Sequence, residues 1–199
     1  MVLPKTLIKF LEPYEKELSR KTNKRGLTIT VSGRAGSGKS LGSKSIAKAF
    51  DLNHVEAGQI LREMAKEQGI SLVEMCKSRG KEVDYEMDRR TLKLAMKGNV
   101  VLDGRLTGWV AGGWADVKIF YECPMEVKAK RVAKREKITP KRAKERLENR
   151  DKEDRKKYRK LYGIDAFDKS IYDIIINNEK LTPKQAKRMP VELVREFLE

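Results

Sequence analysis

The residues with the clearest chemical meaning form an eight-residue run, GRAGSGKS, at positions 33–40. The run satisfies the pattern G-x-x-x-x-G-K-[ST], which is typical of loops that hold nucleotide phosphates. Its three glycines let the backbone wrap tightly, so that successive N–H groups converge on phosphate oxygens, and the helix expected after it adds the positive end of its dipole. We therefore expect this segment, called the phosphate loop below, to bind a nucleoside triphosphate or a similar polyphosphate.

Two side chains of the phosphate loop have expected roles of their own. Lys39 suits contact with the β- and γ-phosphates, and the hydroxyl of Ser40 suits a Mg²⁺ ion bound with the nucleotide. The expected ATP-binding residues are Gly33, Arg34, Ala35, Gly36, Ser37, Gly38, Lys39, Ser40 and Leu41. The loop alone does not separate a kinase from an ATPase or a GTPase. No Asn-Lys-x-Asp guanine-binding motif follows it, however, and the chain is short for a mechanochemical ATPase, so a kinase for a small acceptor remains.

A second candidate site follows the apolar run at residues 100–102. Asp103, Gly104 and Arg105 come directly after this run, and α/β sheets place ligand-binding groups at the carboxyl ends of buried strands. Asp103 could instead cap the next turn, but in a chain with a phosphate loop we favour contact with a metal-bound water for Asp103 and with an acceptor phosphate for Arg105. Arg62 is a further candidate, although alone it is better explained as an exposed helix arginine.

Basic residues concentrate between positions 126 and 160, which hold 17 lysine and arginine residues against 7 aspartate and glutamate residues. This block lies on two expected helices joined near residues 137–139, a hairpin that could close over bound phosphates as a lid. Arginine suits such a lid because its planar fork grips phosphate at two points. The candidates are Arg131, Arg135, Arg146, Arg150, Asp154 and Lys157.

The same basic block would also suit a nucleic-acid surface or a pair of solvated helices. No aromatic residue precedes Tyr158 in it, whereas single-stranded nucleic acids are commonly bound through aromatic stacking. We therefore do not expect nucleic acid as a partner, and an RNA-associated ATPase is kept as the alternative from a different functional class.

Short apolar runs alternate with helical patterns, which predicts a parallel sheet covered by helices. Strands are expected at residues 27–32, 54–56, 100–102, 117–121 and 174–176. Helices are expected at residues 39–50, 59–68 and 139–161, after the capping box of Ser71 and Glu74, up to Gly98, after Pro124, and after Thr182. The expected fold class is thus α/β, with three layers and five parallel strands. Pro190 predicts a kink in the last helix or its division into two pieces.

Length and composition bound the remaining possibilities. The 199 residues are enough for one sizeable core, and 37% of them are charged, with a net charge of +16. No apolar stretch approaches the roughly 18 residues that a membrane span needs, and the first twenty residues lack the apolar core of a signal peptide. Cys76 and Cys123 are far apart in the sequence, so we expect no disulfide and a cytoplasmic location.

Residues 1–26 precede the first expected strand and form a separate segment. Its apolar residues fall on one face of a helix, with charged residues opposite. These residues are Leu3, Leu7, Leu11, Tyr14 and Leu18. We expect a helix that docks on the body of the protein; a helix that binds a membrane surface or a partner is the alternative.

With these residues in place, the chain resembles the archaeal type of cytidylate kinase, within the nucleoside-monophosphate kinase superfamily, over about residues 27–182. The phosphate loop is common to many families, whereas the stretches DGRLTGW at 103–109 and YGID at 162–165 are far more specific. The likeness also includes Ala57 and Gly58 with Arg62, Arg131 with Arg135, and SIYD at 170–173.

The resemblance implies a core domain at residues 27–199, with a helical monophosphate-binding region at 58–98 and a helical lid at 132–149. It implies transfer of the γ-phosphoryl group of ATP to CMP or dCMP with Mg²⁺, and we expect a monomer. The residues assigned to the acceptor are Gly58, Arg62, Asp103, Arg105, Arg150, Asp154 and Lys157; those assigned to phosphoryl transfer are Lys39, Arg105, Arg131 and Arg135; those assigned to the metal are Ser40 and, through water, Asp103.

Two residues depart from the family pattern. Lys157 stands where the family has arginine, which weakens a bidentate contact. Arg34 replaces the usual proline of the phosphate loop and adds a charge beside the phosphates. A kinase for AMP or UMP is therefore the alternative within the same class. His54 needs no catalytic role and is expected to be a hydrogen-bonded histidine at a strand end.

Overall fold

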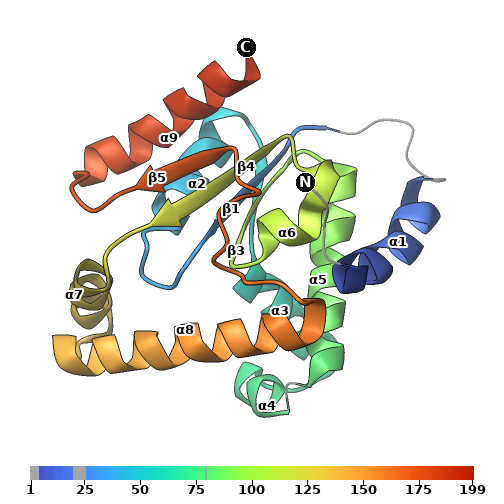
Figure 1. Ribbon diagram of the computed structural model, residues 1–199, viewed down its shortest axis with the longest axis horizontal. Helices are drawn as coiled ribbons and strands as arrows, with labels where there is room; N and C mark the ends of the chain where they lie inside the picture. The colour runs from blue at the N-terminus through green and yellow to red at the C-terminus, as the bar shows by residue number, and fades with distance from the viewer. Residues whose placement is uncertain (1–4, 20–25, 79) are drawn as a thin grey trace.

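The computed structural model describes residues 5–19, 26–78 and 80–199. Five parallel strands form one sheet in the order β2-β3-β1-β4-β5 (Figure 1). The strands are β1 (Thr28–Gly33), β2 (Asn53–Glu56), β3 (Val100–Gly104), β4 (Val117–Glu122) and β5 (Ile174–Asn177). The expected α/β fold with a five-stranded parallel sheet is confirmed.

Helices cover both faces of the sheet, so the central strands β1 and β3 are buried on both faces. On one face, Ile29 and Val31 of β1 pack with Ile46 of α2 (Lys39–Ala49) and Val194 of α9 (Pro183–Leu198). The other face is covered by α5 (Lys81–Lys97), α6 (Thr107–Ala111) and the 3₁₀ turn η1 (Gly112–Trp114). The helix α6 was not predicted, because five residues are too few for a helical period to be recognised in the sequence.

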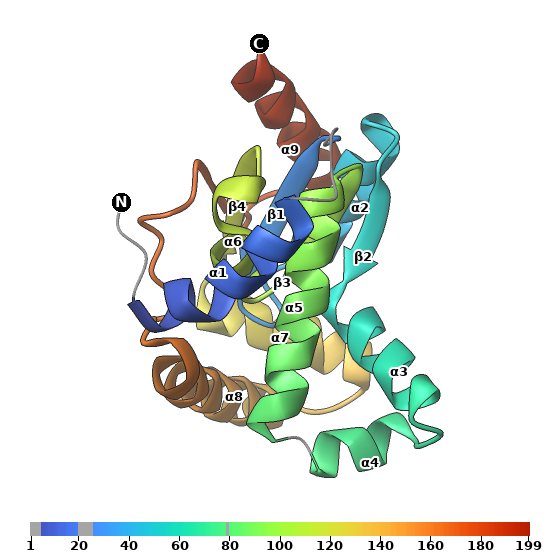
Figure 2. The ribbon, with the colours of Figure 1, turned by 90° about the vertical axis from the view of Figure 1, so that its right-hand side faces the viewer.

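Two further groups of helices extend beyond the sheet (Figure 2). The helices α3 (Ala57–Glu67) and α4 (Leu72–Lys77) pack on α5 through a small apolar cluster, and the capping box predicted for Ser71 and Glu74 is present at the start of α4. The helices α7 (Met125–Glu136) and α8 (Pro140–Tyr162) form a hairpin, with Thr139 capping α8.

The last helix is uninterrupted. The sequence predicted a kink or two pieces at Pro190, and the division into two pieces is wrong, because α9 continues from Pro183 to Leu198. Pro190 is buried and lies close to Gly42 of α2, whose missing side chain allows the two helices to approach. Packing against α2 therefore maintains the helix despite the hydrogen bond that proline cannot donate.

The N-terminal helix α1 (Lys5–Ser19) packs on α5 and α8. Leu7 and Leu11 are buried, the Phe10 ring lies 5.2 Å from the ring of Tyr162, and Thr6 Oγ1 donates a 2.7 Å hydrogen bond to the carbonyl oxygen of Tyr162. Leu3 and the side chains of Tyr14 and Leu18, named above as part of the same face, lie outside the described residues. In the described part of the chain, no helix combines the length and the apolar character needed to cross a bilayer.

The packing of α1 gives a stability prediction. Leu7→Ala should lower the free energy of unfolding by about 2–5 kcal/mol, because a fully buried leucine is replaced by a cavity. Ile8→Ala is the matched control, since Ile8 is 39% exposed and a surface change of this kind costs less than about 0.5 kcal/mol. Urea unfolding measures both, and equal small losses would contradict the docking of α1.

Candidate active site

The phosphate loop connects the end of β1 to the start of α2. Gly38 has a φ of 84°, in the left-handed region, and a Cβ there would lie 2.5 Å from Nδ2 of Asn178. Gly33 likewise has a φ of 147°, and its Cβ would lie 2.5 Å from the carbonyl oxygen of Tyr121. Both positions require glycine, which explains why the motif has glycine there. The loop leads directly into the N-terminus of α2.

Lys39 and Asp103 meet beside this loop. The register of β1 and β3 pairs Val31 with Asp103, so the aspartate lies next to the end of the strand that carries the loop. Lys39 Nζ lies 3.9 Å from Asp103 Oδ1. Burial lowers the pKa of Lys39, and the Asp103 charge opposes this shift. The lysine is thus a largely buried cation for which an anionic phosphate would be a favourable partner.

Two residues that the sequence did not assign to the site fix the orientation of Asp103. Ser43 Oγ donates a 3.0 Å hydrogen bond to Asp103 Oδ2, and the same Oγ lies 2.9 Å from Nε2 of His54. Burial lowers the pKa of His54, which favours the neutral ring. His54 is therefore hydrogen-bonded at a strand end, as expected, and its partner Ser43 holds Asp103.

A cavity of about 300 Å³ lies between the ends of β2 and β3 and the helices α3, α4, α5 and α8. Arg105 and Arg150 give it a cationic wall. Arg105 Nη1 lies 2.9 Å from Asp154 Oδ2, and its side chain is 19% exposed. Burial raises the pKa of Asp154, and Arg105 opposes this shift. For Arg150, burial and the neighbouring Arg105 both lower the pKa. Two adjacent guanidinium groups, of which Arg105 is partly buried, favour an anionic ligand.

The other expected acceptor residues have different positions. Gly58 lines the cavity, and Arg62 Nη1 lies 3.6 Å from the position that a Cβ on Gly58 would take. Lys157 is not among the residues that line the cavity; its Nζ donates a 3.0 Å hydrogen bond to the buried Asp84 Oδ1 on α5. The lysine at this position therefore connects α8 to α5.

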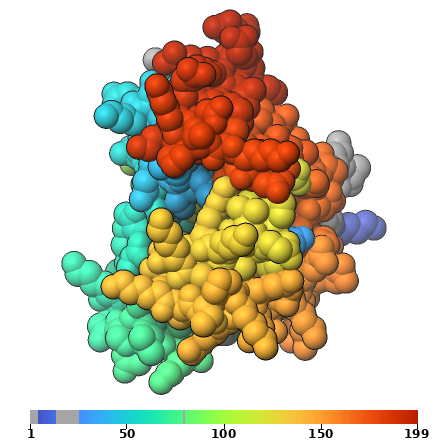
Figure 3. Space-filling model, turned by 90° about the vertical axis from the view of Figure 1, so that its left-hand side faces the viewer, coloured from blue at the N-terminus to red at the C-terminus, as the bar shows by residue number. Residues whose placement is uncertain are grey.

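A smaller cavity of about 230 Å³ lies on the other side of Lys39, between the phosphate loop and α7. Arg131 and Arg135 both line it, together with Gly36, Gly38, Lys39, Ser40, Leu41 and Val132. In the space-filling view of this side, atoms of α2 are visible between α9 and α7 (Figure 3). The structure thus brings the two expected lid arginines to the phosphate loop. Arg146 instead lies 2.6 Å from Glu136 on the exposed surface of the hairpin.

Asn178 connects Arg131 to the phosphate loop beside this smaller cavity. The sequence did not predict a role for it. Its Oδ1 accepts a 2.8 Å hydrogen bond from Arg131 Nη1, its backbone carbonyl accepts one of 2.9 Å from Nη2, and its Nδ2 donates to the Ser37 carbonyl. Asn178 follows β5 directly, so its place after the carboxyl end of a strand was the signal that could have found it.

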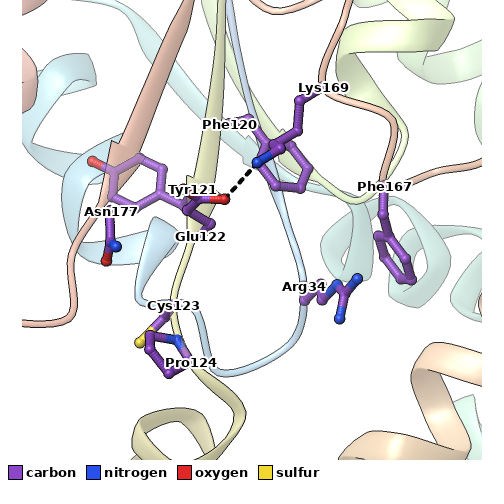
Figure 4. Close-up of a pocket in the computed structure, with 9 residues that line it drawn as sticks. All are labelled: Arg34, Phe120, Tyr121, Glu122, Cys123, Pro124, Phe167, Lys169 and Asn177. Atoms are coloured by element: carbon purple, nitrogen blue, oxygen red, sulfur yellow. Dashed lines mark hydrogen bonds and ion pairs between the residues drawn. The ribbon is translucent and has the colours of Figure 1, made fainter.

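Arg34 does not place its charge inside the phosphate loop. Its Nη1 lies 3.3 Å from Asp151 Oδ2, and its guanidinium lies 4.1 Å from the centre of the Phe167 ring. Figure 4 shows the guanidinium turned towards Phe167, in a separate hollow of about 350 Å³. Asp151 also pairs with the buried Lys128 at 3.4 Å. The Arg34 side chain therefore lies against Phe167 and shares Asp151 with Lys128, and the expectation that Arg34 adds charge beside the phosphates stays a prediction.

Comparison with known proteins agrees with this geometry. The model of the cytidylate kinase-like family matches residues 28–180. The cytidylate kinase of Pyrococcus horikoshii is 50% identical over 160 residues, which cover 79% of this chain and 83% of that protein. That of Thermococcus kodakarensis is 47% identical over 159 residues, covering 79% and 82%.

A solved structure, the shikimate kinase of Acinetobacter baumannii in complex with shikimate, superposes with a TM-score of 0.60 and 13% identity, over 86% of this chain and 94% of that one. At this identity the likeness concerns the fold alone. The family match spans more than half of the sequence, and the relatives align over most of their length. The chain belongs to the cytidylate kinase-like family.

Proposed function

We propose that this protein transfers the γ-phosphoryl group of ATP to CMP or dCMP, giving ADP and CDP or dCDP. The observation that carries the proposal is that Lys39 and Ser40 line both cavities. A nucleotide on the Arg131 side and a monophosphate on the Arg105 side would therefore meet at the phosphate loop. The relatives are named cytidylate kinases, and this name supports cytosine as the base of the acceptor.

The proposed reaction is an in-line displacement. An oxygen of the acceptor phosphate forms a bond to the γ-phosphorus as the bond from that phosphorus to the β,γ-bridging oxygen breaks. The acceptor oxygen is already anionic, so no strong protein base is required. Lys39, Arg105, Arg131 and Arg150 would neutralise the charge of the transferring group and hold the two phosphates in line. Closure of the α7–α8 hairpin at residues 132–149 over the donor would exclude water.

Residues at the phosphate loop fit a Mg²⁺ ion. Mg²⁺ prefers oxygen ligands and keeps several waters when it is bound with nucleotide phosphates. The Ser40 hydroxyl and the Asp103 carboxylate line the same cavity, and Ser43 holds one Asp103 oxygen in place. Ser40 would contact the ion directly and Asp103 through water. When bound, the ion would neutralise charge on the donor phosphates.

The same proposal includes a role in pyrimidine nucleotide metabolism, a monomeric enzyme and a cytoplasmic location. The cysteines support the location, because Cys76 and Cys123 are both free thiols and structural disulfides are rare in reducing compartments. The monophosphate-binding region at residues 58–98 would supply the outer wall of the acceptor cavity.

The proposal is tested by measuring ATP-dependent diphosphate formation with CMP, dCMP, UMP and AMP as separate acceptors. Rapid CDP or dCDP formation, with one ADP released per product, is the expected result. Faster turnover of UMP or AMP would reassign the acceptor within the same enzyme class. ATP hydrolysis that uses none of these acceptors and is stimulated by RNA would contradict the kinase assignment and favour the nucleic-acid-associated ATPase.

A further inference from the structure

We propose that Asp88 selects cytosine over uracil by accepting a hydrogen bond from the 4-amino group of the acceptor base. This inference rests on the proposed function, because it assigns a base-recognition role within the acceptor cavity. Asp88 was not among the residues expected from the sequence. It lies on α5, lines the acceptor cavity and is 4% exposed.

The cavity has two chemically different regions. Lys39, Arg105 and Arg150 lie towards the phosphate loop, and they are the cations that would hold the monophosphate. The helices α3, α4 and α5 contribute Leu61, Cys76, Met87, Asp88 and Thr91. The phosphate must lie against the cations to react, so the base extends towards these helices. Leu61 and Met87 are apolar and suit the faces of a pyrimidine ring, and Asp88 supplies a carboxylate beside them.

A fixed hydrogen bond orients the Asp88 carboxylate. Tyr162 Oη donates a 2.7 Å hydrogen bond to Asp88 Oδ2. Tyr162 is itself fully buried and held by α1 through Thr6 and Phe10. A carboxylate has two oxygens with about four lone-pair sites in total, so the hydrogen bond from Tyr162 is compatible with a further bond from a ligand. Asp88 is therefore a positioned acceptor with a defined direction.

Cytosine and uracil carry different groups at ring position 4. Cytosine carries a 4-amino group, which donates hydrogen bonds, whereas uracil carries a carbonyl oxygen, which only accepts them. A buried carboxylate would attract the amino group and repel the carbonyl oxygen. Sites built to hydrogen-bond one substrate group discriminate strongly against analogues that lack it.

The neighbouring carboxylates are less suited to this role. Glu56 lines the cavity at the end of β2 and pairs with Lys44 at 3.2 Å. Asp103 lies beside Lys39 at the phosphate loop. Asp84 is buried on α5, one turn before Asp88, but it pairs with Lys157 and is not among the residues that line the cavity. Asp88 is therefore the carboxylate that faces the base region.

The test compares kcat/KM for CMP and UMP in the native protein, in Asp88→Asn and in Asp84→Asn. We expect the CMP-to-UMP ratio to fall at least about a hundredfold in Asp88→Asn, because the amide can donate to the uracil carbonyl and no longer repels it. Asp84→Asn is the matched control: it makes the same change on the same helix at a buried residue outside the cavity, and it should keep the native ratio. An unchanged ratio in Asp88→Asn, or an equal fall in both variants, overturns the proposal.

A second measurement needs only the native protein. A CMP analogue with hydrogen in place of the 4-amino group should be phosphorylated with a kcat/KM at least about tenfold lower than that of CMP, the loss that corresponds to one hydrogen bond. Equal use of the analogue and CMP would overturn the role of Asp88 while the kinase activity stands. Failure of the native protein to phosphorylate CMP would instead remove the proposed function, and the inference with it.

Discussion

Replacing Lys39 by alanine should lower kcat for phosphoryl transfer at least about a hundredfold, the scale of losing one charge contact to the transition state. Lys39 is placed where the two cavities meet, and its side chain is only 16% exposed. The positive charge of Lys39 can therefore stabilise both the transferring phosphoryl group and the oxygen that leaves with ADP. A water molecule in place of the ammonium group would carry no charge. Steady-state kinetics with saturating ATP and CMP measure this loss.

Lys39→Ala should also have a defined effect on the free energy of unfolding, with and without ATP. Burial lowers the pKa of Lys39, so the folded protein binds this proton less tightly than the unfolded chain does. The charged lysine therefore reduces the stability of the ligand-free protein at neutral pH, and this penalty disappears as the pH rises through the lowered pKa towards the ordinary one. Lys39→Ala should thus not lower the free energy of unfolding. It should, however, lose most of the stabilisation by ATP, which is about 2.7 kcal/mol at one hundred times Kd.

The control for Lys39 lies on the same helix. Lys44 is 62% exposed and pairs with Glu56, so Lys44→Ala removes a lysine from α2 without removing a charge at the phosphate loop. Turnover of Lys44→Ala should stay within about threefold of native, because exposed ion pairs contribute little. Near-native turnover of Lys39→Ala would refute the role given to the phosphate-loop lysine.

Replacing Arg105 by alanine should lower kcat/KM for CMP by a similar factor, at least about a hundredfold. Arg105 lies at the end of β3, next to Arg150 and paired with Asp154 at 2.9 Å. Removing it deletes a contact to the acceptor phosphate and leaves Asp154 buried without this partner, so Arg105→Ala should also be less stable. With alanine as the only variant, the loss of stability could not be separated from the loss of the acceptor contact.

Arg105→Lys separates the two effects. It keeps a positive charge for Asp154 and should retain most of the stability, but an ammonium group cannot grip a phosphate with the planar fork of arginine. We expect its KM for CMP to rise while its KM for ATP stays native. Arg155→Ala, at an exposed arginine of α8 that pairs with Asp165, is the control and should have native kinetics. A native KM for CMP in Arg105→Lys would contradict the acceptor contact.

Much of the fold was readable from local pattern. The alternation of apolar runs with helical segments predicted the five parallel strands, and the structure confirms the helix starts expected after the capping box of Ser71 and Glu74 and at residue 139. The sequence placed the phosphate loop and Asp103 each at the carboxyl end of a strand, and in a parallel sheet these ends lie on the same side. Their contact also requires β1 and β3 to be neighbours, which is a finding of the structure.

Contacts between segments that are far apart in the sequence could not be predicted from it. Asn178 binds Ser37, which is 141 positions earlier, and Tyr162 binds Asp88, which is 74 positions earlier. No local periodicity encodes such pairs, because they depend on how helices pack after the sheet has formed. The orientation of Arg34 is a similar case. Its place in the motif suggested phosphate contact, whereas the nearby Asp151 and Phe167 determine where its side chain lies.

The central claim is most directly tested by one competition experiment. The native protein is given ATP and Mg²⁺ with equal concentrations of CMP, UMP and AMP in one mixture, and the diphosphates are separated and counted at early times. The ratio of CDP to UDP then equals the ratio of the kcat/KM values for CMP and UMP, and AMP use appears as ADP in excess of CDP and UDP together. We predict that CDP forms in large excess over UDP and that ADP appears in step with CDP. ADP formed without CDP or UDP would contradict phosphoryl transfer to a pyrimidine monophosphate.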